Sequence, residues 1–438
     1  MEAQWLLQPA MRFLNSLRKV TTMNDAVSEP WLSIIGIGER GLDGLTNEAK
    51  IMITKAEVVI GGKRHLSFLP ESKQERISWP HPISALVDKI SEFKGRKTCV
   101  LATGDPMCFG IGSTLSKAFS VREMIILPSP SALSLTCARM GWQYKDVELI
   151  TLHGRPLASI EAYLQPLAKL VVLSNDEHSP KEVAHLLKKR GFGNSRITVW
   201  EHMDGPLERC LEGIAGSWDE KPGAAFNTIA VEILSSPGTI KRTRTPGLND
   251  DLFMNDGMLT KKEIRAITLS ALEPYPGGLL WDIGAGSGSI SIEWMRLSAR
   301  SMAIAIEKNP ARAALIIENA RQLGVPNLEV INGHAPECLK SLPRPNAIFI
   351  GGGITKEALF DQCWNSLQDG GCLVSNVVTV DGEGLILQKQ KQFGGSLTKI
   401  AISKLDPIGK FRGWRPQMPV TQLKISKNLG ESIPNNEK

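Results

Sequence analysis

From Trp31 onward, short apolar runs rich in β-branched residues alternate with amphipathic stretches of helix length. Such runs predict buried strands, and the stretches between them predict helices that cover a sheet. In the first half the predicted strands are 32–37, 58–60, 98–102, 124–127, 170–173, 197–201 and 229–233. This alternation indicates an α/β domain with mostly parallel sheets. Because two prolines follow the fourth strand, we expect the domain to split into two lobes near Pro128.

A Pro-Gly-rich segment with basic residues and little periodicity interrupts this pattern and predicts a linker. Beyond it the pattern resumes with a predicted helix at 261–272 and strands at 278–283, 303–306, 328–331, 347–350 and 371–377. The expected order is therefore a disordered extension (1–30), a two-lobed domain (31–235, lobes about 31–128 and 129–235), a linker (236–251), a second α/β domain (252–426) and a polar tail (427–438).

Composition narrows the class of protein. The chain has 438 residues, 42% of them hydrophobic and 22% charged, as expected for a soluble globular protein with several domains. The net charge of +6 is too small to indicate nucleic-acid binding and suits an anionic small molecule. Seven scattered cysteines without a CxxC spacing indicate neither a disulfide framework nor a metal site. No run reaches the roughly 18 apolar residues of a membrane span, so we expect no membrane partner. Together with the small net charge and the scattered cysteines, this leads us to expect a cytoplasmic protein without nucleic-acid partners.

The second half carries a glycine-rich turn between a predicted strand and a helix. Its glycines permit a sharp turn and leave room for a ligand at the helix N-terminus. They alternate, unlike the G-x-G-x-x-G of a dinucleotide site, which favours a nucleoside without pyrophosphate. An acidic residue at the end of the next strand can accept hydrogen bonds from both ribose hydroxyls. The residues expected to contact the nucleoside are Asp282, Gly284, Ala285, Gly286, Ser287, Gly288, Glu307, His334 and Ala335.

This order of motifs resembles the class I methyltransferases, which have a Rossmann-like fold and use S-adenosylmethionine. The resemblance implies that this nucleoside is S-adenosylmethionine, with an NAD site as the alternative. Thr260, at the start of the segment TKKEIRA, is expected to join the cofactor site.

The first half contains GIGERG at 36–41, which formally matches G-x-G-x-x-G. A dinucleotide site also needs an acidic residue at the end of the second strand, but that strand ends in Gly61 and Gly62. With the GDP loop after strand 98–102, the pattern instead resembles the tetrapyrrole methylase family, in which S-adenosylmethionine lies between two α/β lobes. The resemblance implies a second cofactor site at Gly36, Gly38, Gly104, Asp105 and Pro106.

Further segments narrow the resemblance. GGKRHL, LHGR and FNTIAVEI in the first half resemble the branch that methylates a late precorrin, and IFIGGG, LQDGGCLVSNVVT and GWRPQMPV in the second resemble its decarboxylating partner. The span 31–425 is thus similar to a fused family of cobalamin biosynthesis. That resemblance implies methylation of precorrin-6Y at C5 and C15, with decarboxylation of the ring C acetate, to give precorrin-8X. It also implies a homo-oligomer.

The implied substrate is a polyanion, so basic side chains near the motif loops are expected to bind its carboxylates. The substrate-binding candidates are Lys63, Arg64, Arg155, Lys261 and Arg265, together with Gly351 and Gly352, which leave room beside the backbone. The implied nucleophile is a carbon of the macrocycle, so no side-chain nucleophile is required. Arg64, His65, His153 and Arg155 are the catalytic candidates, although both histidines could instead have structural roles.

Two other functions remain open from the sequence. An RNA methyltransferase would require a dense basic and aromatic surface, for which the sequence offers only the cluster at 241–244. A non-catalytic S-adenosylmethionine sensor would need one cofactor site rather than two.

Overall fold

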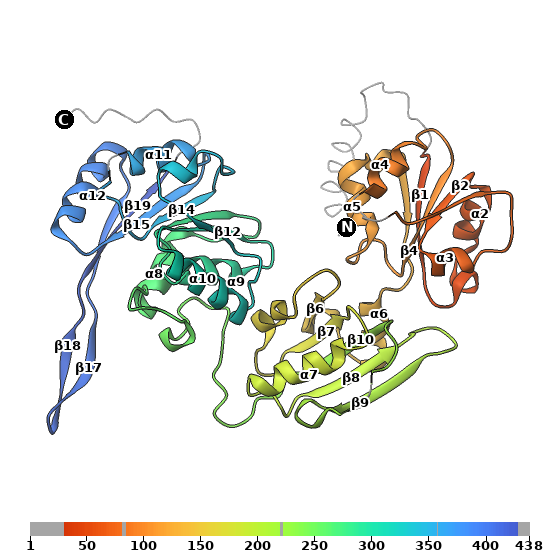
Figure 1. Ribbon diagram of the computed structural model, residues 1–438, viewed down its shortest axis with the longest axis horizontal. Helices are drawn as coiled ribbons and strands as arrows, with labels where there is room; N and C mark the ends of the chain where they lie inside the picture. Colours follow the sequence, from red (N-terminus) through yellow and green to blue (C-terminus); the bar gives the residue numbers. More distant parts are fainter. Residues whose placement is uncertain (1–29, 81–84, 220–221, 357, 428–438) are drawn as a thin grey trace, which may run out of the picture. The chain divides into compact units, whose positions relative to one another are not determined.

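The computed structural model of the protein describes residues 30–80, 85–219, 222–356 and 358–427. Almost all of the predicted N-terminal extension and of the predicted polar tail lies outside these ranges. The chain forms two compact units (Figure 1). The first runs to Tyr144 and includes Trp200–Cys210, and the second comprises Lys145–Val199 and the chain from Leu211 onward. The predicted second lobe and the predicted C-terminal domain thus share most of one unit.

The first unit contains a five-stranded sheet with the order β3-β2-β4-β1-β5. Its strands are β1 (Leu32–Ile37), β2 (Val58–Gly61), β3 (Glu75–Ser78), β4 (Thr98–Thr103) and β5 (Met124–Leu127). Its helices are α2 (Asn47–Lys55), α3 (Lys63–Ser67), α4 (Leu86–Ser91), α5 (Ile111–Ala118) and α6 (Ala132–Met140). All of its paired strands are parallel, as predicted. Strand β3 was not predicted because its residues are polar and partly exposed.

The central strands of this sheet are buried on both faces. Ile34 and Val100 belong to one apolar cluster, and their neighbours Ile35 and Leu101 belong to another. Successive side chains of a strand point to opposite faces, so continuous apolar runs of this kind suit a parallel sheet covered by helices on both sides.

A second five-stranded sheet has the order β6-β7-β10-β8-β9. Its strands are β6 (Val147–Thr151), β7 (Lys169–Leu173), β8 (Arg196–Glu201), β9 (Arg209–Ile214) and β10 (Asn227–Glu232), with helix α7 at Ser179–Lys189. Strand β7 pairs parallel with β6 and antiparallel with β10, so this sheet is mixed, while most strand pairings of the first half are parallel, as predicted. The sequence alone did not predict β6 or β9, whose residues are largely half-exposed or exposed.

The seven-stranded sheet of the C-terminal half has the order β13-β12-β11-β14-β15-β19-β16. Its strands are β11 (Leu279–Ile283), β12 (Met302–Glu307), β13 (Glu329–Asn332), β14 (Ala347–Ile350), β15 (Cys372–Val377), β16 (Ser396–Ile400) and β19 (Val420–Ser426). The helices are α8 (Lys262–Leu272), α9 (Ser289–Leu297), α10 (Pro310–Gln322), α11 (Leu359–Ser366) and α12 (Val380–Phe393). The first strand of this series, β11, lies between β12 and β14, both parallel to it. Such a reversal of strand order marks where α/β sheets bind ligands.

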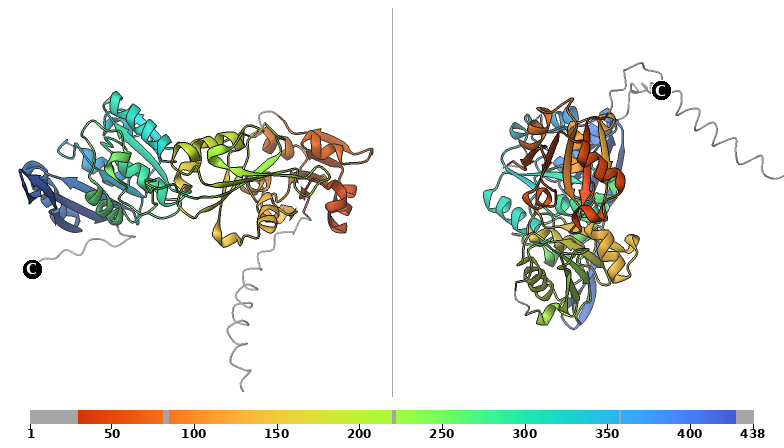
Figure 2. Two further views of the ribbon diagram at one scale, coloured as in Figure 1. Left: turned by 90° about the horizontal axis from the view of Figure 1, so that it is seen from below. Right: turned by 90° about the vertical axis from the view of Figure 1, so that its right-hand side faces the viewer.

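One hairpin extends away from this sheet, formed by β17 (Ser403–Ile408) and β18 (Phe411–Pro416). It projects downward in Figure 1, and in the left view of Figure 2 its dark blue lies at the outer end of this half. Phe411 and Trp414 are 80% and 70% exposed. The sequence did not predict these strands, because their apolar side chains are exposed and do not form the alternating pattern of a strand packed against a core.

The predicted linker is anchored at its centre. Glu161, which is 3% exposed, forms ion pairs with Arg190 at 2.6 Å and with Arg242 of the linker at 3.0 Å. Arg242 also donates a hydrogen bond to the carbonyl of Gln322 in α10 at 2.9 Å. A side chain at Gly324 would lie within 2.1 Å of the main-chain nitrogen of Ala162. These contacts hold the second lobe and the C-terminal domain together.

We expect the substitution Glu161→Ala to destabilise the second unit. It leaves two largely buried guanidinium groups without their carboxylate, which costs on the order of 3 kcal/mol. Denaturant unfolding followed by fluorescence measures the effect. The matched control is Glu318→Ala, which removes a surface pair with Arg321 and is expected to cost less than about 1 kcal/mol. Equal midpoints for the two variants would contradict a stabilising role for Glu161.

Candidate cofactor and substrate sites

A pocket of about 790 Å³ lies at the carboxyl edge of the seven-stranded sheet. Its wall consists of the glycine loop after β11, the ends of the neighbouring strands and two segments from elsewhere in the chain, 257–261 and 417–420. The predicted site residues that line it are Thr260, Lys261, Gly284, Ala285, Gly286, Glu307, Ala335, Gly351 and Gly352. The predicted residues Asp282, Ser287, Gly288 and His334 do not line it, and His334 is exposed.

Glu307 ties the glycine loop to the neighbouring strand. Its carboxylate accepts hydrogen bonds from the main-chain nitrogens of Gly286 and Asn309, both at 2.9 Å. Gly286 has φ of 61°, and a Cβ there would lie 2.9 Å from the carbonyl oxygen of Met258. Only glycine therefore suits this position, for reasons of both conformation and space. Glu307 is 4% exposed and lines the pocket, so its carboxylate faces both the loop and the ligand space.

Asp282 lies behind the glycine loop with one oxygen unsatisfied. Its Oδ2 accepts hydrogen bonds from the main-chain nitrogen of Ser291 at 3.1 Å and from the Ser291 hydroxyl at 2.6 Å. Its Oδ1 and the hydroxyl of Ser287 are buried without a partner among the described residues. Burial raises the pKa of Asp282 to about 6, and the charge of Glu307 adds to this shift. Neither residue lines the pocket, so these atoms lie behind the glycine loop rather than in the ligand space.

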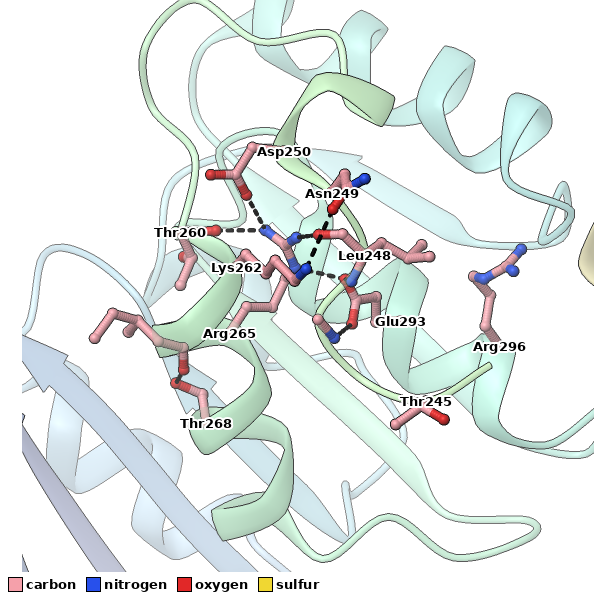
Figure 3. A network of polar contacts seen from close by, with 12 residues as sticks. Thr245, Leu248, Asn249, Asp250, Thr260, Lys262, Arg265, Thr268, Glu293 and Arg296 are labelled. Atoms are coloured by element: carbon pink, nitrogen blue, oxygen red, sulfur yellow. Dashed lines mark hydrogen bonds and ion pairs between the residues drawn. The ribbon is translucent and has the colours of Figure 1, made fainter. Parts of the chain in front are cut away.

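Arg265 is completely buried and is not among the residues that line the pocket. Figure 3 shows its guanidinium surrounded by its polar partners. Its guanidinium forms an ion pair with Glu293 at 2.5 Å and donates to the carbonyls of Thr260, at 2.5 Å, and Leu248. A further ion pair reaches Asp250 at 3.2 Å. The prediction that Arg265 binds substrate carboxylates is therefore corrected: it fixes the segment that ends at Thr260 against helix α8.

Basic side chains of the pocket include three that the sequence analysis did not single out. These are Lys308, Arg312 and Lys356, beside the predicted Lys261. Lys356 donates to the carbonyl of Ala335 at 3.2 Å, and Arg312 pairs with Asp256 at 2.8 Å. Lys308 directly follows Glu307, and Lys356 follows the glycines at 351–353, so proximity to the motif loops was the available signal.

In the first unit, three loops converge at the carboxyl ends of β1, β4 and β5. A Cβ at Gly36, near the end of β1, would overlap the carbonyl oxygen of Gly104, so this strand end and the loop after β4 touch through their backbones. Ser129 links them, since its nitrogen donates to Gly104 at 3.2 Å and its hydroxyl to the carbonyl of Gly36 at 2.7 Å. The predicted Gly38, Asp105 and Pro106 lie in these same loops.

A polar cluster adjoins these loops. Arg64 forms an ion pair with Glu39 and hydrogen-bonds Thr103 at 3.3 Å. His65 is 6% exposed and its Nε2 lies 3.0 Å from the Thr103 hydroxyl. Burial and the neighbouring Arg64 lower the pKa of His65 to about 4. His65 is therefore a weak base and stays neutral at physiological pH.

The cluster also includes His202, which the sequence did not point out. Its Nδ1 lies 2.8 Å from Oε2 of Glu39, although the two residues are 163 positions apart. Glu39 could have been noticed as the acidic residue inside GIGERG, whereas no local pattern marks His202.

The remaining predicted residues are exposed. Lys63 begins helix α3 of the first unit, and His153 and Arg155 lie in the turn after β6, in the second unit. Among the described residues, no group of three His, Cys, Asp or Glu side chains is placed to bind a metal ion. Within those same ranges, every helix is too short or too polar to cross a membrane.

Comparison with known proteins finds relatives for both halves. A family model described as Tetrapyrrole (Corrin/Porphyrin) Methylases matches residues 32–209, and one described as Precorrin methyltransferase domain matches residues 251–427. The chain is 43% identical over 409 residues to the precorrin-6Y C(5,15)-methyltransferase [decarboxylating] of Sinorhizobium sp, covering 93% of this chain and 99% of the relative.

Two separate proteins of Salmonella typhimurium each resemble part of the chain. The cobalt-precorrin-7 C(5)-methyltransferase is 33% identical over 41% of this chain and 88% of its own length. The cobalt-precorrin-6B C(15)-methyltransferase (decarboxylating) is 31% identical over 41% of this chain and 96% of its own length.

The raised pKa of Asp282 predicts a pH-dependent stability. Between its ordinary value of 3.8 and about 6, the folded protein binds this proton more tightly than the unfolded chain, so stability falls as pH rises. At neutral pH the ionised carboxylate costs on the order of 3 kcal/mol, and Asp282→Asn removes this cost.

We therefore expect the Asp282→Asn protein, without cofactor, to unfold at higher denaturant concentration than the wild type at pH 8 but not at pH 4. Asp381→Asn, at an exposed position, is the matched control and should not change the pH dependence. A wild-type curve that the Asp282→Asn substitution leaves unchanged at every pH would contradict this account.

Proposed function

Since the chain belongs to the family of decarboxylating precorrin-6Y C(5,15)-methyltransferases, we propose that two S-adenosylmethionine sites, one in each half, divide that family's reaction between them. The reaction methylates precorrin-6Y at C5 and C15 and removes the carboxyl group of the ring C acetate, giving precorrin-8X. The protein is thus a methyltransferase of cobalamin biosynthesis. The family matches favour this over an RNA methyltransferase or a cofactor sensor.

The separate Salmonella relatives support a division by half. The decarboxylating relative is a C(15)-methyltransferase, and the C-terminal half matches the precorrin methyltransferase model. The other relative methylates C(5), and the N-terminal half matches the tetrapyrrole methylase model. We assign methylation at C15 and decarboxylation to the C-terminal half, and methylation at C5 to the N-terminal half.

In the C-terminal half, the observation that carries the proposal is the pocket beside the glycine loop. Glu307 would accept the ribose hydroxyls, the backbone at Gly284 and Gly286 would cradle the amino-acid portion, and Ala335 would contact the base. S-adenosylmethionine supplies an electrophilic methyl group when bound.

The pocket continues beyond these cofactor residues to a wall that suits a polyanion. Lys261 and Lys356 lie on it and are exposed, so their ammonium groups can pair with the carboxylates of a tetrapyrrole. Gly351 and Gly352 leave room for a large ring beside the backbone. The main contribution of the protein is alignment of the carbon with the methyl group, worth about 7 to 11 kcal/mol in well-oriented reactions.

In the N-terminal half, the loops at Gly36, Gly38 and Gly104–Pro106 would hold the second cofactor mainly through backbone groups. Arg64 lies at the same edge of the sheet, where Lys63 and Arg64 can meet substrate carboxylates. His153 and Arg155 stay candidates from the second lobe.

Two further properties belong to the proposal. The exposed aromatic residues of the β17–β18 hairpin support self-association into a homo-oligomer, because exposed apolar patches commonly mark protein interfaces. Cys99, Cys137, Cys363 and Cys372 are buried free thiols, which supports a reducing, cytoplasmic location.

The proposal is tested by titrating the full-length chain with S-adenosylhomocysteine and by incubating it with precorrin-6Y and labelled methyl donor. We expect two binding sites and a product that has gained two methyl groups and lost one carbon dioxide. A single binding site, or transfer of label to RNA but not to precorrin-6Y, would overturn the proposal.

We expect Glu307→Ala to weaken cofactor binding in the C-terminal half by about 1 to 3 kcal/mol, because the ribose loses its buried acceptor. Methylation at C15 and decarboxylation should fall, while the cofactor site of the N-terminal half should keep its affinity for S-adenosylhomocysteine. Calorimetric titration and product mass measure both effects. Glu329→Ala, at an exposed carboxylate on β13, is the matched control. Equal loss of affinity at both binding sites in a folded Glu307→Ala protein would contradict the assignment of one site to each half.

A further inference from the structure

We propose that His202, oriented by Glu39, accepts the proton that is released when the N-terminal half methylates its substrate. This inference rests on the function proposed above. His202 would be the catalytic residue, since it would touch the substrate. Glu39 would be a positioning residue, since it would act through the imidazole.

The reaction requires such an acceptor. As the carbon–methyl bond forms, the sulfur–methyl bond breaks, and the sulfonium becomes a neutral thioether. The positive charge passes to the macrocycle, which becomes neutral again by losing a proton. A neutral imidazole can take this proton and pass it to water, so no oxidant, reductant or further reactant is needed.

The geometry of the pair suits this role. Oε2 of Glu39 lies 2.8 Å from Nδ1 of His202 and accepts its hydrogen bond, which leaves Nε2 as the basic nitrogen of the neutral ring. The Glu39 side chain is 11% exposed and that of His202 is 26% exposed. The carboxylate is thus held inside while the imidazole reaches the surface. Carboxylate–imidazole pairs of this kind fix both the tautomer and the orientation of the ring.

The pair lies beside the loops proposed to bind the cofactor. Glu39 directly follows Gly38, and its other oxygen pairs with Arg64. Arg64 in turn hydrogen-bonds Thr103, the last residue before Gly104. These residues lie at the carboxyl ends of β1, β2 and β4, which share one edge of the sheet.

The turn that carries His202 is built with unusual backbone conformations. His202 and Asp204 have φ of 46° and 65°, in the left-handed region that non-glycine residues rarely adopt. A Cβ at Gly205 would lie 2.6 Å from Cβ of Glu39, so the turn fits directly against the GIGERG loop. Strained residues of this kind cluster at functional sites.

The rest of the turn is anchored to helix α6. Glu208 pairs with Arg139 of α6 and accepts a hydrogen bond from the main-chain nitrogen of Asp204 at 2.6 Å. The hydroxyl of Thr136 in α6 donates to the sulfur of Met203 at 3.6 Å. Among the contacts of this turn, Glu39 contacts the imidazole and Arg64 contacts Glu39, whereas Glu208 and Arg139 anchor the turn. The anchoring contacts are separate from the Glu39 contact, so the two can be varied independently.

The experiment measures C5 methylation by the full-length chain with precorrin-6Y as substrate, in His202→Asn, His202→Ala and Glu39→Gln proteins. We expect His202→Asn to lower kcat for C5 methylation about 100-fold with little change in KM, and Glu39→Gln to lower it about 10-fold. The decline of the wild-type rate at acidic pH should disappear in His202→Asn. Added imidazole should restore part of the His202→Ala activity.

Controls separate chemistry from folding. C15 methylation and decarboxylation by the same chains, and two binding sites for S-adenosylhomocysteine, confirm that each variant is folded. Glu208→Gln loosens the same turn without touching the Glu39–His202 pair, and should keep the wild-type pH profile. His185→Asn removes an exposed imidazole from α7 and should leave all rates unchanged.

The outcomes are distinct. If His202→Asn keeps its C5 rate within about three-fold of the wild type, or if imidazole fails to restore any activity to folded His202→Ala, the inference is wrong. If Glu208→Gln reproduces the His202→Asn pH profile, the histidine only supports the turn and the inference is equally wrong. If the wild-type chain itself transfers no methyl group to precorrin-6Y, the proposed function fails instead.

Discussion

In a parallel sheet, the carboxyl ends of neighbouring strands lie along one edge, and both proposed sites depend on this constraint. In the N-terminal half it brings Gly36, Gly104 and Ser129 into backbone contact although they come from three strands. In the C-terminal half it places Glu307 next to the glycine loop of the preceding strand. Neither arrangement needs sequence proximity; each needs only that neighbouring strands of the sheet run in the same direction.

Buried ion pairs hold several main-chain segments of the second unit in place. Arg265 and Glu293 bind the segment at Thr260 to helix α8, and Glu161 binds the linker to the second lobe. Buried ion pairs add little net stability, but removal of one partner is costly, so they favour one arrangement of the chain over others. In this protein the Arg265–Glu293 pair sets the position of the segment at Thr260, which lines the pocket, although Arg265 itself does not line it.

The sequence predicted most of the parallel strands because buried strands are continuous apolar runs, and β1, β5 and β14 have the bounds that were expected. The glycine loops and Glu307 were predictable because their spacing is local. The role of Arg265 was predicted wrongly because the sequence alone does not distinguish an arginine that faces solvent from one that is buried against Glu293. His202 was missed because its partner, Glu39, is distant in sequence, and the β17–β18 hairpin because its apolar residues face outward.

The contact between Gly324 and Ala162 limits how the two sides of the junction can change. Two separately named proteins of Salmonella typhimurium each resemble 41% of this chain. In this single chain, the bare backbone at 324 and the guanidinium of Arg242 fit directly against the neighbouring lobe. Both sides of the junction are therefore inherited together, so a bulky side chain at 324 or the loss of Arg242 would require a matching change in that lobe.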